Sequence, residues 1–276
     1  MGIAADIRND WNAALAALAW QVDLGVSEVV QDAPQNSFDL PDAAPWTRRM
    51  AEPAAAPAPA APPRRGQAEP ARPLSVGADP VRVATDLARA CLTLESLRTA
   101  MQDFDLCELK KGARNTVFAD GNPAARVLIL GEAPGREEDQ EGRPFVGRAG
   151  QLLDRMFAAI GLSRGSADRG TALYITNVMP WRPPGNRDPE PAEIAMMRPF
   201  VERHIALANP DVIVTVGNTP LEALTGQRGI LAARGTWVEA FGKPLMPMTH
   251  PAYLLRNPAA KREAWADLLA IKAKLR

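Results

Sequence analysis

The feature that most constrains this chain is an apolar strand pattern that leads into a glycine-rich loop and then into a helical pattern. Residues 126–130 form a β-branched apolar run that is too short for a helix and is typical of a buried strand. The loop over 131–147 precedes a helix-period apolar face over 149–161. Open α/β sheets bind ligands where such a loop follows the carboxyl end of a strand. The loop fits neither the dinucleotide fingerprint nor the phosphate-binding loop, so an ordinary strand–helix connection stays an alternative.

The same alternation continues along the chain. Further strand patterns occur at 172–176, 212–216 and 244–248, and helical patterns occur at 80–101, 190–208, 219–225 and 259–275. In the short helix, we expect Thr219 to cap the first turn, with Glu222 completing a capping box. The alternation predicts an α/β fold with a central four-stranded parallel sheet and helices on both faces.

The first 77 residues differ from the rest in composition. Residues 1–33 predict an amphipathic helical extension, with its helix at 4–24, that docks on other protein surface. Residues 34–77 predict an exposed linker, because the stretch 51–73 holds seven prolines, nine alanines and no aromatic residue. We therefore expect the alternating pattern to form a separate domain over 78–276.

Charge and cysteine content narrow the class of protein. Lysine plus arginine equal aspartate plus glutamate at 32 each, yet residues 1–42 carry a net charge of −6 and residues 243–276 a net charge of +5. The basic end suits an anionic partner or a solvated helix face equally well. Two cysteines make a disulfide framework unexpected and favour an intracellular, cytoplasmic protein. No apolar run is long enough to span a membrane, so we expect no membrane association.

Polar residues follow each predicted strand, namely Glu132, Asn177, Asn218 and His250. Because the carboxyl ends of parallel strands lie along one rim of a sheet, Glu132, Asn177 and His250 should lie near one another. This convergence predicts a functional site. The other histidine, His204, lies inside a helical pattern, so we interpret it as structural or solvated.

Several stretches together resemble a known family. They are Gly-Glu-Ala-Pro-Gly at 131–135, Gly-Arg-Pro-Phe-Val-Gly at 142–147, Ile-Thr-Asn at 175–177, Arg-Pro-Pro-Gly-Asn-Arg at 182–187 and His-Pro-Ala-Tyr-Leu-Leu-Arg at 250–256. In order and register, over about residues 104–276, they are similar to family 4 uracil-DNA glycosylases. The resemblance implies a three-layer α/β fold and an enzyme of base excision repair. Such an enzyme hydrolyses the bond between uracil and deoxyribose and leaves an abasic site.

The resemblance also implies roles for particular residues. It assigns catalysis to Glu132, Glu138 and His250, uracil binding to Ala133, Phe145, Asn177 and Asn186, and DNA binding to Tyr253, Leu254, Leu255 and Arg256.

These roles agree with side-chain chemistry, although each has a plainer alternative. Phe145 offers a flat face to an extruded base or is a core residue; Asn177 matches the edge of uracil or caps a turn. His250 would donate a hydrogen bond to the uracil O2 as negative charge develops there. The stretch 253–256 would wedge into the base stack, with Arg256 at a phosphate, or anchor a loop in the core.

One departure from the family concerns its iron–sulfur cluster, which cysteines hold. Phe104 stands at the first of those positions and Trp181 at the third, the fourth falls near Met196 or Met197, and Cys107 alone is retained. A single thiolate cannot hold such a cluster. We therefore expect an apolar mini-core in its place and no cofactor.

Two other functions stay open at this point. A non-enzymatic binder of abasic or damaged DNA would keep Phe145 and the wedge, and it would not need His250. A nucleotide-binding α/β enzyme of another class is disfavoured because the phosphate-loop pattern is absent. Acidic residues at 137–141 could suggest Mg²⁺, but solvated carboxylates are commoner and we expect no metal. The expected partner is uracil-containing DNA, single- or double-stranded, bound by a monomer.

Overall fold

The computed structural model describes residues 79–276, so the predicted N-terminal helix and linker lie outside the described residues. The helices are α3 (Pro80–Ala90), α4 (Leu94–Asp103), α5 (Leu109–Gly112), α6 (Arg136–Glu141), α7 (Arg148–Ala158), α8 (Pro191–Ala208), α9 (Asn218–Thr225), α10 (Ile230–Ala233), α11 (Pro251–Arg256) and α12 (Lys261–Lys274). Two 3-10 turns are η3 (Pro184–Asn186) and η4 (Pro258–Ala260). The strands are β1 (Ala119–Gly121), β2 (Val127–Gly131), β3 (Leu173–Asn177), β4 (Val212–Val216), β5 (Val238–Ala240) and β6 (Lys243–Met248).

The strands form one sheet in the order β1-β3-β2-β4-β6-β5. The central strands β3, β2, β4 and β6 run parallel, which confirms the predicted four-stranded parallel sheet. The edge strands β1 and β5 are antiparallel to their neighbours and were not predicted. Each edge strand is only three residues long and lacks the fully buried pattern of the central strands, so neither gives a strong sequence signal.

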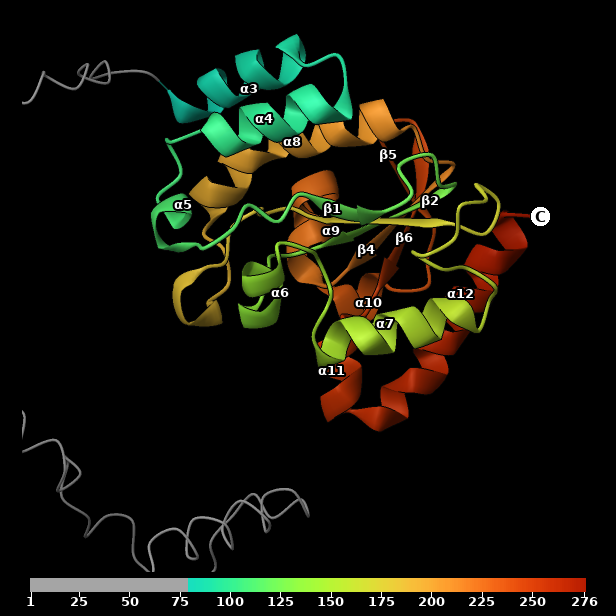
Figure 1. Cartoon of the computed structure of the whole chain (residues 1–276). Coiled ribbons are helices and arrows are strands. Elements are labelled where there is room, and N and C mark those ends of the chain that lie inside the picture. The colour runs from blue at the N-terminus through green and yellow to red at the C-terminus, as the bar shows by residue number, and fades with distance from the viewer. Residues whose placement is uncertain (1–78) are drawn as a thin grey trace, which may run out of the picture. The chain divides into compact units, whose positions relative to one another are not determined.

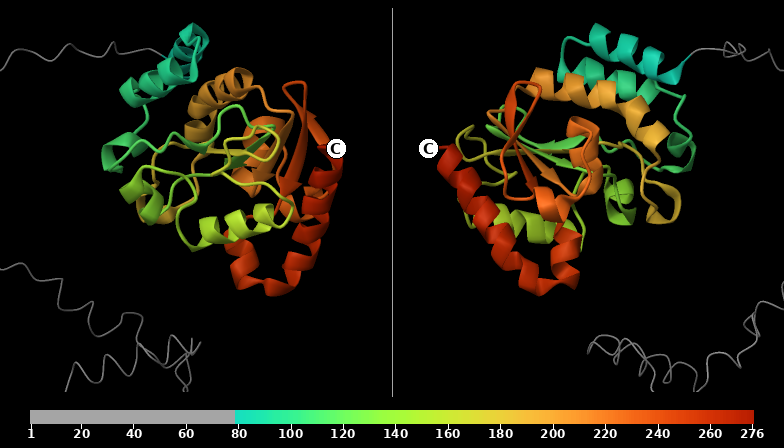
Figure 2. Two further views of the ribbon diagram at one scale, coloured as in Figure 1. Left: turned by 45° about the vertical axis from the view of Figure 1, so that its right-hand side comes forward. Right: turned by 180° about the vertical axis from the view of Figure 1, so that it is seen from behind.

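Helices cover both faces of this sheet, as the views of Figures 1 and 2 show together. Helices α3, α4 and α8 lie over one face, and α7, α11 and α12 lie over the other. Alternate side chains of β2 enter the two cores: Leu128 and Leu130 pack with Phe200, while Val127 and Ile129 pack with Phe157. The central strands are apolar on both faces for this reason.

Two predicted helix details differ from the structure. The pattern at 80–101 is two helices, because Thr93 accepts a hydrogen bond from the Ser96 amide and starts α4 afresh. Thr219 does not cap α9, which begins after Gly217 at a φ of 105°. The Thr219 hydroxyl donates to Glu132 instead, so a contact between elements replaces the local cap.

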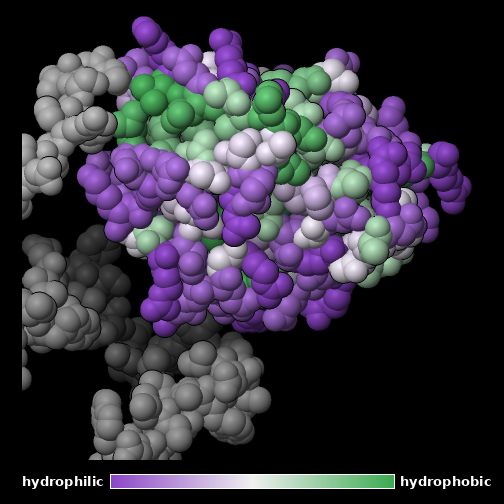
Figure 3. All heavy atoms as spheres, turned by 45° about the horizontal axis from the view of Figure 1, so that its top comes forward, coloured by the Kyte–Doolittle hydropathy of each residue, from purple (hydrophilic) through white to green (hydrophobic). Residues whose placement is uncertain are grey.

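The face formed by α3 and α4 leaves some apolar side chains in contact with solvent. Val81 and Leu87 are each 37% exposed and Leu92 is 78% exposed. Figure 3 shows apolar surface among hydrophilic residues on this side of the molecule. Cys91 is buried there, and its thiol donates to the carbonyl of Leu87. Within residues 79–276, no helix combines the length and the apolar character that a membrane crossing requires.

Candidate active site

A cavity of about 640 Å³ lies at the carboxyl ends of the parallel strands. Of the residues predicted for a site, it is lined by Glu132, Ala133, Glu138, Phe145, Asn177, Asn186, His250, Tyr253 and Arg256. The predicted convergence of polar residues that follow β2, β3 and β6 is therefore present in the structure.

Asn177, the last residue of β3, brings an unsatisfied amide to this cavity. Its side chain is almost fully buried at 5% exposure, and its Oδ1 atom has no hydrogen-bond partner. Buried polar atoms are nearly always paired, so an unpaired one in a cavity wall calls for a donor from a ligand or water. Asn177 is thus ready to accept a hydrogen bond from a bound molecule.

Gly131, at the end of β2, lets Asn177 and Phe145 approach each other. A Cβ atom at this position would lie 2.3 Å from Asn177 Oδ1 and 2.5 Å from the Phe145 ring. Any larger residue would therefore clash with both side chains. The glycine supplies close approach here, since its φ is not in the left-handed region.

Phe145 and His250 form neighbouring parts of the cavity wall. Their ring centroids lie 5.7 Å apart with the planes tilted by 34°. Phe145 is 7% exposed and also packs with the core beneath β2 and β3. It is therefore both a core residue and a cavity residue, which the sequence analysis had treated as alternatives.

His250 precedes α11 and has one ring nitrogen already engaged. Its Nδ1 atom accepts a hydrogen bond of 3.2 Å from the Ala252 amide. The pKa of His250 is lowered to about 4, mainly by burial and also by the positive charge of Arg256, while Glu138 opposes the shift. The ring is thus neutral at pH 7 with its proton on Nε2, because Nδ1 acts as the acceptor. This leaves an N–H donor on the nitrogen that Ala252 does not engage.

Glu132 follows β2 and is held by a residue that sequence analysis had assigned a different role. The Thr219 hydroxyl donates to Glu132 Oε2 at 2.6 Å. Burial raises the pKa of Glu132, the hydrogen bond from Thr219 counters this, Asp188 raises the pKa and Arg228 lowers it. Thr219 directly follows Asn218, the polar residue predicted for the rim after β4, so extending that prediction by one residue would have found it.

Glu138, to which the resemblance assigns a part in catalysis, lines the cavity while backbone amides bind its carboxylate. Its carboxylate accepts hydrogen bonds from the amides of Gly135, Val146 and Gly147, each at 3.0 Å. Its neighbour Asp139 accepts from two further backbone amides. Among the described residues, no group of three or more histidine, cysteine or acidic side chains could hold a metal ion.

The predicted wedge at 253–256 divides between the cavity and the core. Tyr253 and Arg256 line the cavity, whereas Leu254 is fully buried and packs in the core beside α7 and α12. Leu255 is partly buried against the same core. In this structure Leu254 therefore anchors α11 instead of reaching DNA, because a helix presents successive residues to different sides.

The cavity also has lining residues that sequence analysis did not select, including Leu231 and Thr249. Leu231 is 59% exposed. The turn before it is fixed by Asn218 Oδ1, which accepts from the amides of Gly229 at 3.2 Å and Ile230 at 2.9 Å. Asn218 was recognised as a strand-end residue, but nothing in the local sequence marks Leu231 as lying at the cavity.

The positions that hold an iron–sulfur cluster in the resembled family do not fit one here. Phe104, Cys107, Trp181 and Met197 are each at most 2% exposed and belong to one hydrophobic core. Phe104 packs edge-on against Phe200 with ring centroids 5.4 Å apart, and Trp181 Nε1 donates to Thr116. One thiol among aromatic and thioether side chains is not a cluster donor set.

Comparisons with known proteins agree with this geometry. Residues 118–269 match the model of the "Uracil DNA glycosylase superfamily". A "Type-4 uracil-DNA glycosylase" of Thermotoga maritima is 42% identical over 55% of this chain and 77% of its own length. Proteins of the same description from Archaeoglobus fulgidus and Sulfurisphaera tokodaii are 38% and 36% identical, and each is covered over 84% of its length.

Proposed function

Because this chain belongs to the uracil-DNA glycosylase superfamily, we propose that its cavity is the place where uracil is hydrolysed from DNA. The protein is a monofunctional DNA glycosylase of base excision repair. Water adds to the anomeric carbon of the deoxyribose, the bond from that carbon to N1 of uracil breaks, and uracil leaves as an anion that takes up a proton. An abasic site is left in the strand.

The unpaired Asn177 Oδ1 atom is the observation that carries this proposal. Uracil has an N3–H donor beside its O4 acceptor, so one primary amide can accept from N3–H and donate to O4. Cytosine has an acceptor at N3 and a donor at C4, so the same amide orientation would leave both partners unsatisfied. Asn177 therefore selects uracil over cytosine.

Phe145 and His250 act on the rest of the base. An extruded uracil stacks on the Phe145 ring, which supports the base without reading its identity. His250 donates a hydrogen bond from its Nε2–H group to O2, where charge accumulates as the glycosidic bond breaks. A neutral histidine suits this role because it stabilises the leaving anion without giving up its proton. Donors placed in advance at a developing charge typically contribute about 10²–10³ in rate.

The two glutamates have different parts in this proposal. Glu132 is the carboxylate that orients the attacking water and stabilises the cationic sugar, with Thr219 holding its Oε2 atom. Glu138 shapes the loop, since both of its oxygens are bound by backbone amides. Ala133 and Asn186 line the uracil side of the cavity, and Arg182 fixes the Asn186 side chain through a bond of 2.7 Å.

DNA is held around the mouth of the cavity. Arg256 faces a phosphate, and Tyr253 contacts the strand next to the extruded nucleotide. The exposed Leu231 reaches the space that the base vacates. We further propose that the enzyme works inside the cell as a monomer, on single or double strands, without a metal or cofactor.

Excision from DNA with one uracil tests the function. Single- and double-stranded oligonucleotides should give alkali-labile breaks at that position, and matched cytosine controls should stay intact. His250→Ala should lower the single-turnover rate by about 10²–10³ while binding of uracil-DNA changes little, because O2 becomes charged mainly in the transition state. A His250→Ala protein that excises at the parent's rate would exclude this mechanism. A parent that binds but never excises would favour the non-enzymatic alternative.

A further inference from the structure

The loop that carries Phe145 depends on other residues for its shape. Phe145 has a φ of 55°, in the left-handed region that residues other than glycine rarely adopt. Such a backbone conformation persists only where the surrounding structure fixes it. The groups that bind the peptides on either side of Phe145 therefore decide where its ring lies.

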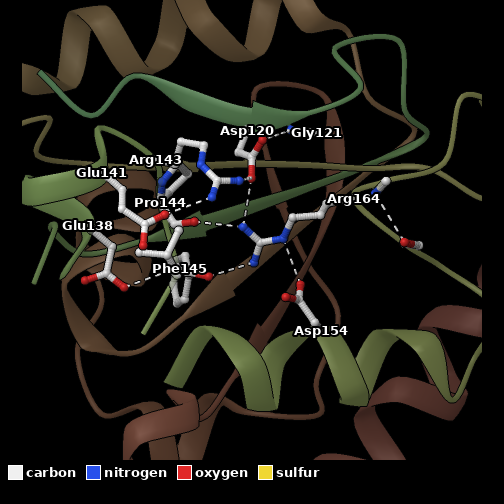
Figure 4. Close-up of polar contacts among 12 residues, drawn as sticks. Asp120, Gly121, Glu138, Glu141, Arg143, Pro144, Phe145, Asp154 and Arg164 are labelled. Carbon is white, nitrogen blue, oxygen red and sulfur yellow. Dashed lines mark hydrogen bonds and ion pairs between the residues drawn. The ribbon is translucent and has the colours of Figure 1, made fainter. Parts of the chain in front are cut away.

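Arg164 binds the carbonyl groups of this loop. Its guanidinium donates to the oxygen of Pro144 at 2.8 Å and to the oxygen of Phe145 at 2.9 Å. A planar guanidinium holds several donors in one fixed arrangement, so it binds two successive carbonyls at once. Figure 4 shows Arg164 between this loop and two carboxylates.

Glu138 binds the amide groups that follow Phe145. It accepts from the amides of Val146 and Gly147 through its Oε1 atom. The peptide groups around Phe145 are thus held from one side by a cation at their carbonyls and from the other by an anion at their amides. The cation therefore lies at the negative, carbonyl end of the peptide dipoles and the anion at the positive, amide end.

Arg164 is itself firmly placed. Its Nε donates to Asp154 at 2.8 Å and its Nη1 to Asp120 at 3.0 Å, and its side chain is 15% exposed. Asp154 lies on α7 and Asp120 on β1. The arginine therefore connects the Phe145 loop to two separate elements.

Gly150 leaves the loop little room to move toward α7. A Cβ atom at this position would lie 1.8 Å from the Phe145 carbonyl oxygen. The first turn of α7 is thus in direct contact with the carbonyl group that Arg164 binds.

We propose that Arg164 is a positioning residue that, with Glu138, keeps the Phe145 ring in place for the extruded base. This inference rests on the function proposed above. Arg164 is not among the cavity-lining residues, so it acts only through the loop. It also lies outside every stretch that carries the family resemblance.

Single-turnover kinetics over a range of enzyme concentrations test this role. Arg164→Gln should raise the half-saturating concentration about tenfold, the scale of a partly lost base–aromatic stack. The maximal rate should change much less, because a stacked ring stabilises the bound base and its transition state alike. Arg164→Lys, which keeps the charge but not the fork of donors, should recover part of the loss. Asp154→Asn is a milder change, because Asp154 is more exposed than Arg164. It should also raise the half-saturating concentration.

A double substitution separates positioning from general stability. In a Phe145→Leu background, which keeps apolar bulk but removes the flat ring, Arg164→Gln should have little further effect on the half-saturating concentration. An equal effect in both backgrounds would overturn the proposal. Arg126→Gln is the matched control, since Arg126 also binds an aspartate and a carbonyl, those of Asp211 and Leu275. It should lower thermal stability and leave excision kinetics unchanged.

Hydrogen exchange tests the clamp without DNA. The amides of Val146 and Gly147 should exchange faster in Arg164→Gln than in the parent and the Arg126→Gln control. Unchanged protection would overturn the proposal, even with altered kinetics. A parent protein that fails to excise uracil would instead refute the proposed function, and the exchange result would still decide whether Arg164 holds the loop.

Discussion

At the scale of single residues, the two histidines are both buried, yet they have different roles. Burial keeps both rings neutral: it lowers the pKa of His204 to about 3 and that of His250 to about 4. His204 shares a hydrogen bond of 2.9 Å with the Tyr174 hydroxyl and stacks on Phe118, so it is structural, one of the two roles predicted for it. His250 instead lines the cavity with one ring nitrogen still available.

The neutral His204 should make stability depend on pH. The unfolded chain takes up a proton near the ordinary histidine pKa of about 6.5, whereas the folded protein resists protonation at His204 down to about pH 3. The contribution of His204 to the free energy of unfolding is therefore complete above about pH 6.5 and declines as the pH falls. The slope is at most about 1.4 kcal/mol per pH unit for this residue.

Urea unfolding of the parent and of His204→Gln at pH 7.0, 6.0 and 5.0 measures this slope. The variant should be less stable at pH 7.0 and lose less stability between pH 6.0 and 5.0. The only other histidine, His250, also has a lowered pKa and is present in both proteins. Its contribution to the pH dependence of stability therefore cancels when the two proteins are compared. Parallel pH dependences would contradict a buried, neutral His204.

A second prediction at this scale concerns Asn177. Asn177→Ala removes the amide that reads the uracil edge, so excision should slow by about 10- to 100-fold, in line with the loss of buried hydrogen bonds. The preference for binding uracil-DNA over the matched cytosine-DNA should fall as well. Competition binding with the two oligonucleotides measures this preference. A variant that loses rate yet retains the full preference would show that another group selects the base.

At the scale of elements, loops and helix ends are shaped by side-chain contacts between segments. Glu138 and Arg164 bind the Phe145 loop from opposite sides. The Thr219 hydroxyl donates to Glu132 and does not cap its own helix. The segment around Trp181, which precedes η3 and Asn186, depends on the mini-core of Phe104, Cys107 and Met197. We expect apolar packing there to support this segment in place of the metal cluster of the resembled family.

The mini-core should stabilise the folded protein without iron. Trp181 is 1% exposed, so Trp181→Ala should cost about 3–5 kcal/mol of unfolding free energy, and added iron and sulfide should not restore it. Trp265, which is 44% exposed, gives the matched control: Trp265→Ala should change stability by about 0.5 kcal/mol or less. The purified protein should be colourless. Brown protein with about four irons per chain, the content of a [4Fe–4S] cluster, would overturn this account.

At the scale of the whole molecule, the cavity-lining residues named above all lie within the described residues 79–276. Every central strand and both covering helix layers lie within them.

A chain that begins at residue 78 should therefore fold and excise uracil at a rate within about threefold of the full chain, since it keeps every cavity-lining residue named above and every central strand. Limited proteolysis of the full chain should cut first within residues 51–73, where the composition cannot form a core. Thermal melts control for folding of the shortened protein. A folded protein over 78–276 that no longer excises uracil would place the N-terminal segment in the active unit.

The sequence by itself determined the central strands, most of the helices and the residues that meet at the rim. Their signals are local: apolar period, glycine-rich turns and a polar residue after each strand, which a parallel sheet then brings together. Only the tertiary structure decided the roles of Thr219, Leu254 and Arg164. Each depends on which distant group a side chain meets, such as Glu132 for Thr219 or the Phe145 carbonyl for Arg164. No local pattern encodes such a contact, because it exists only after the sheet has brought separate segments together.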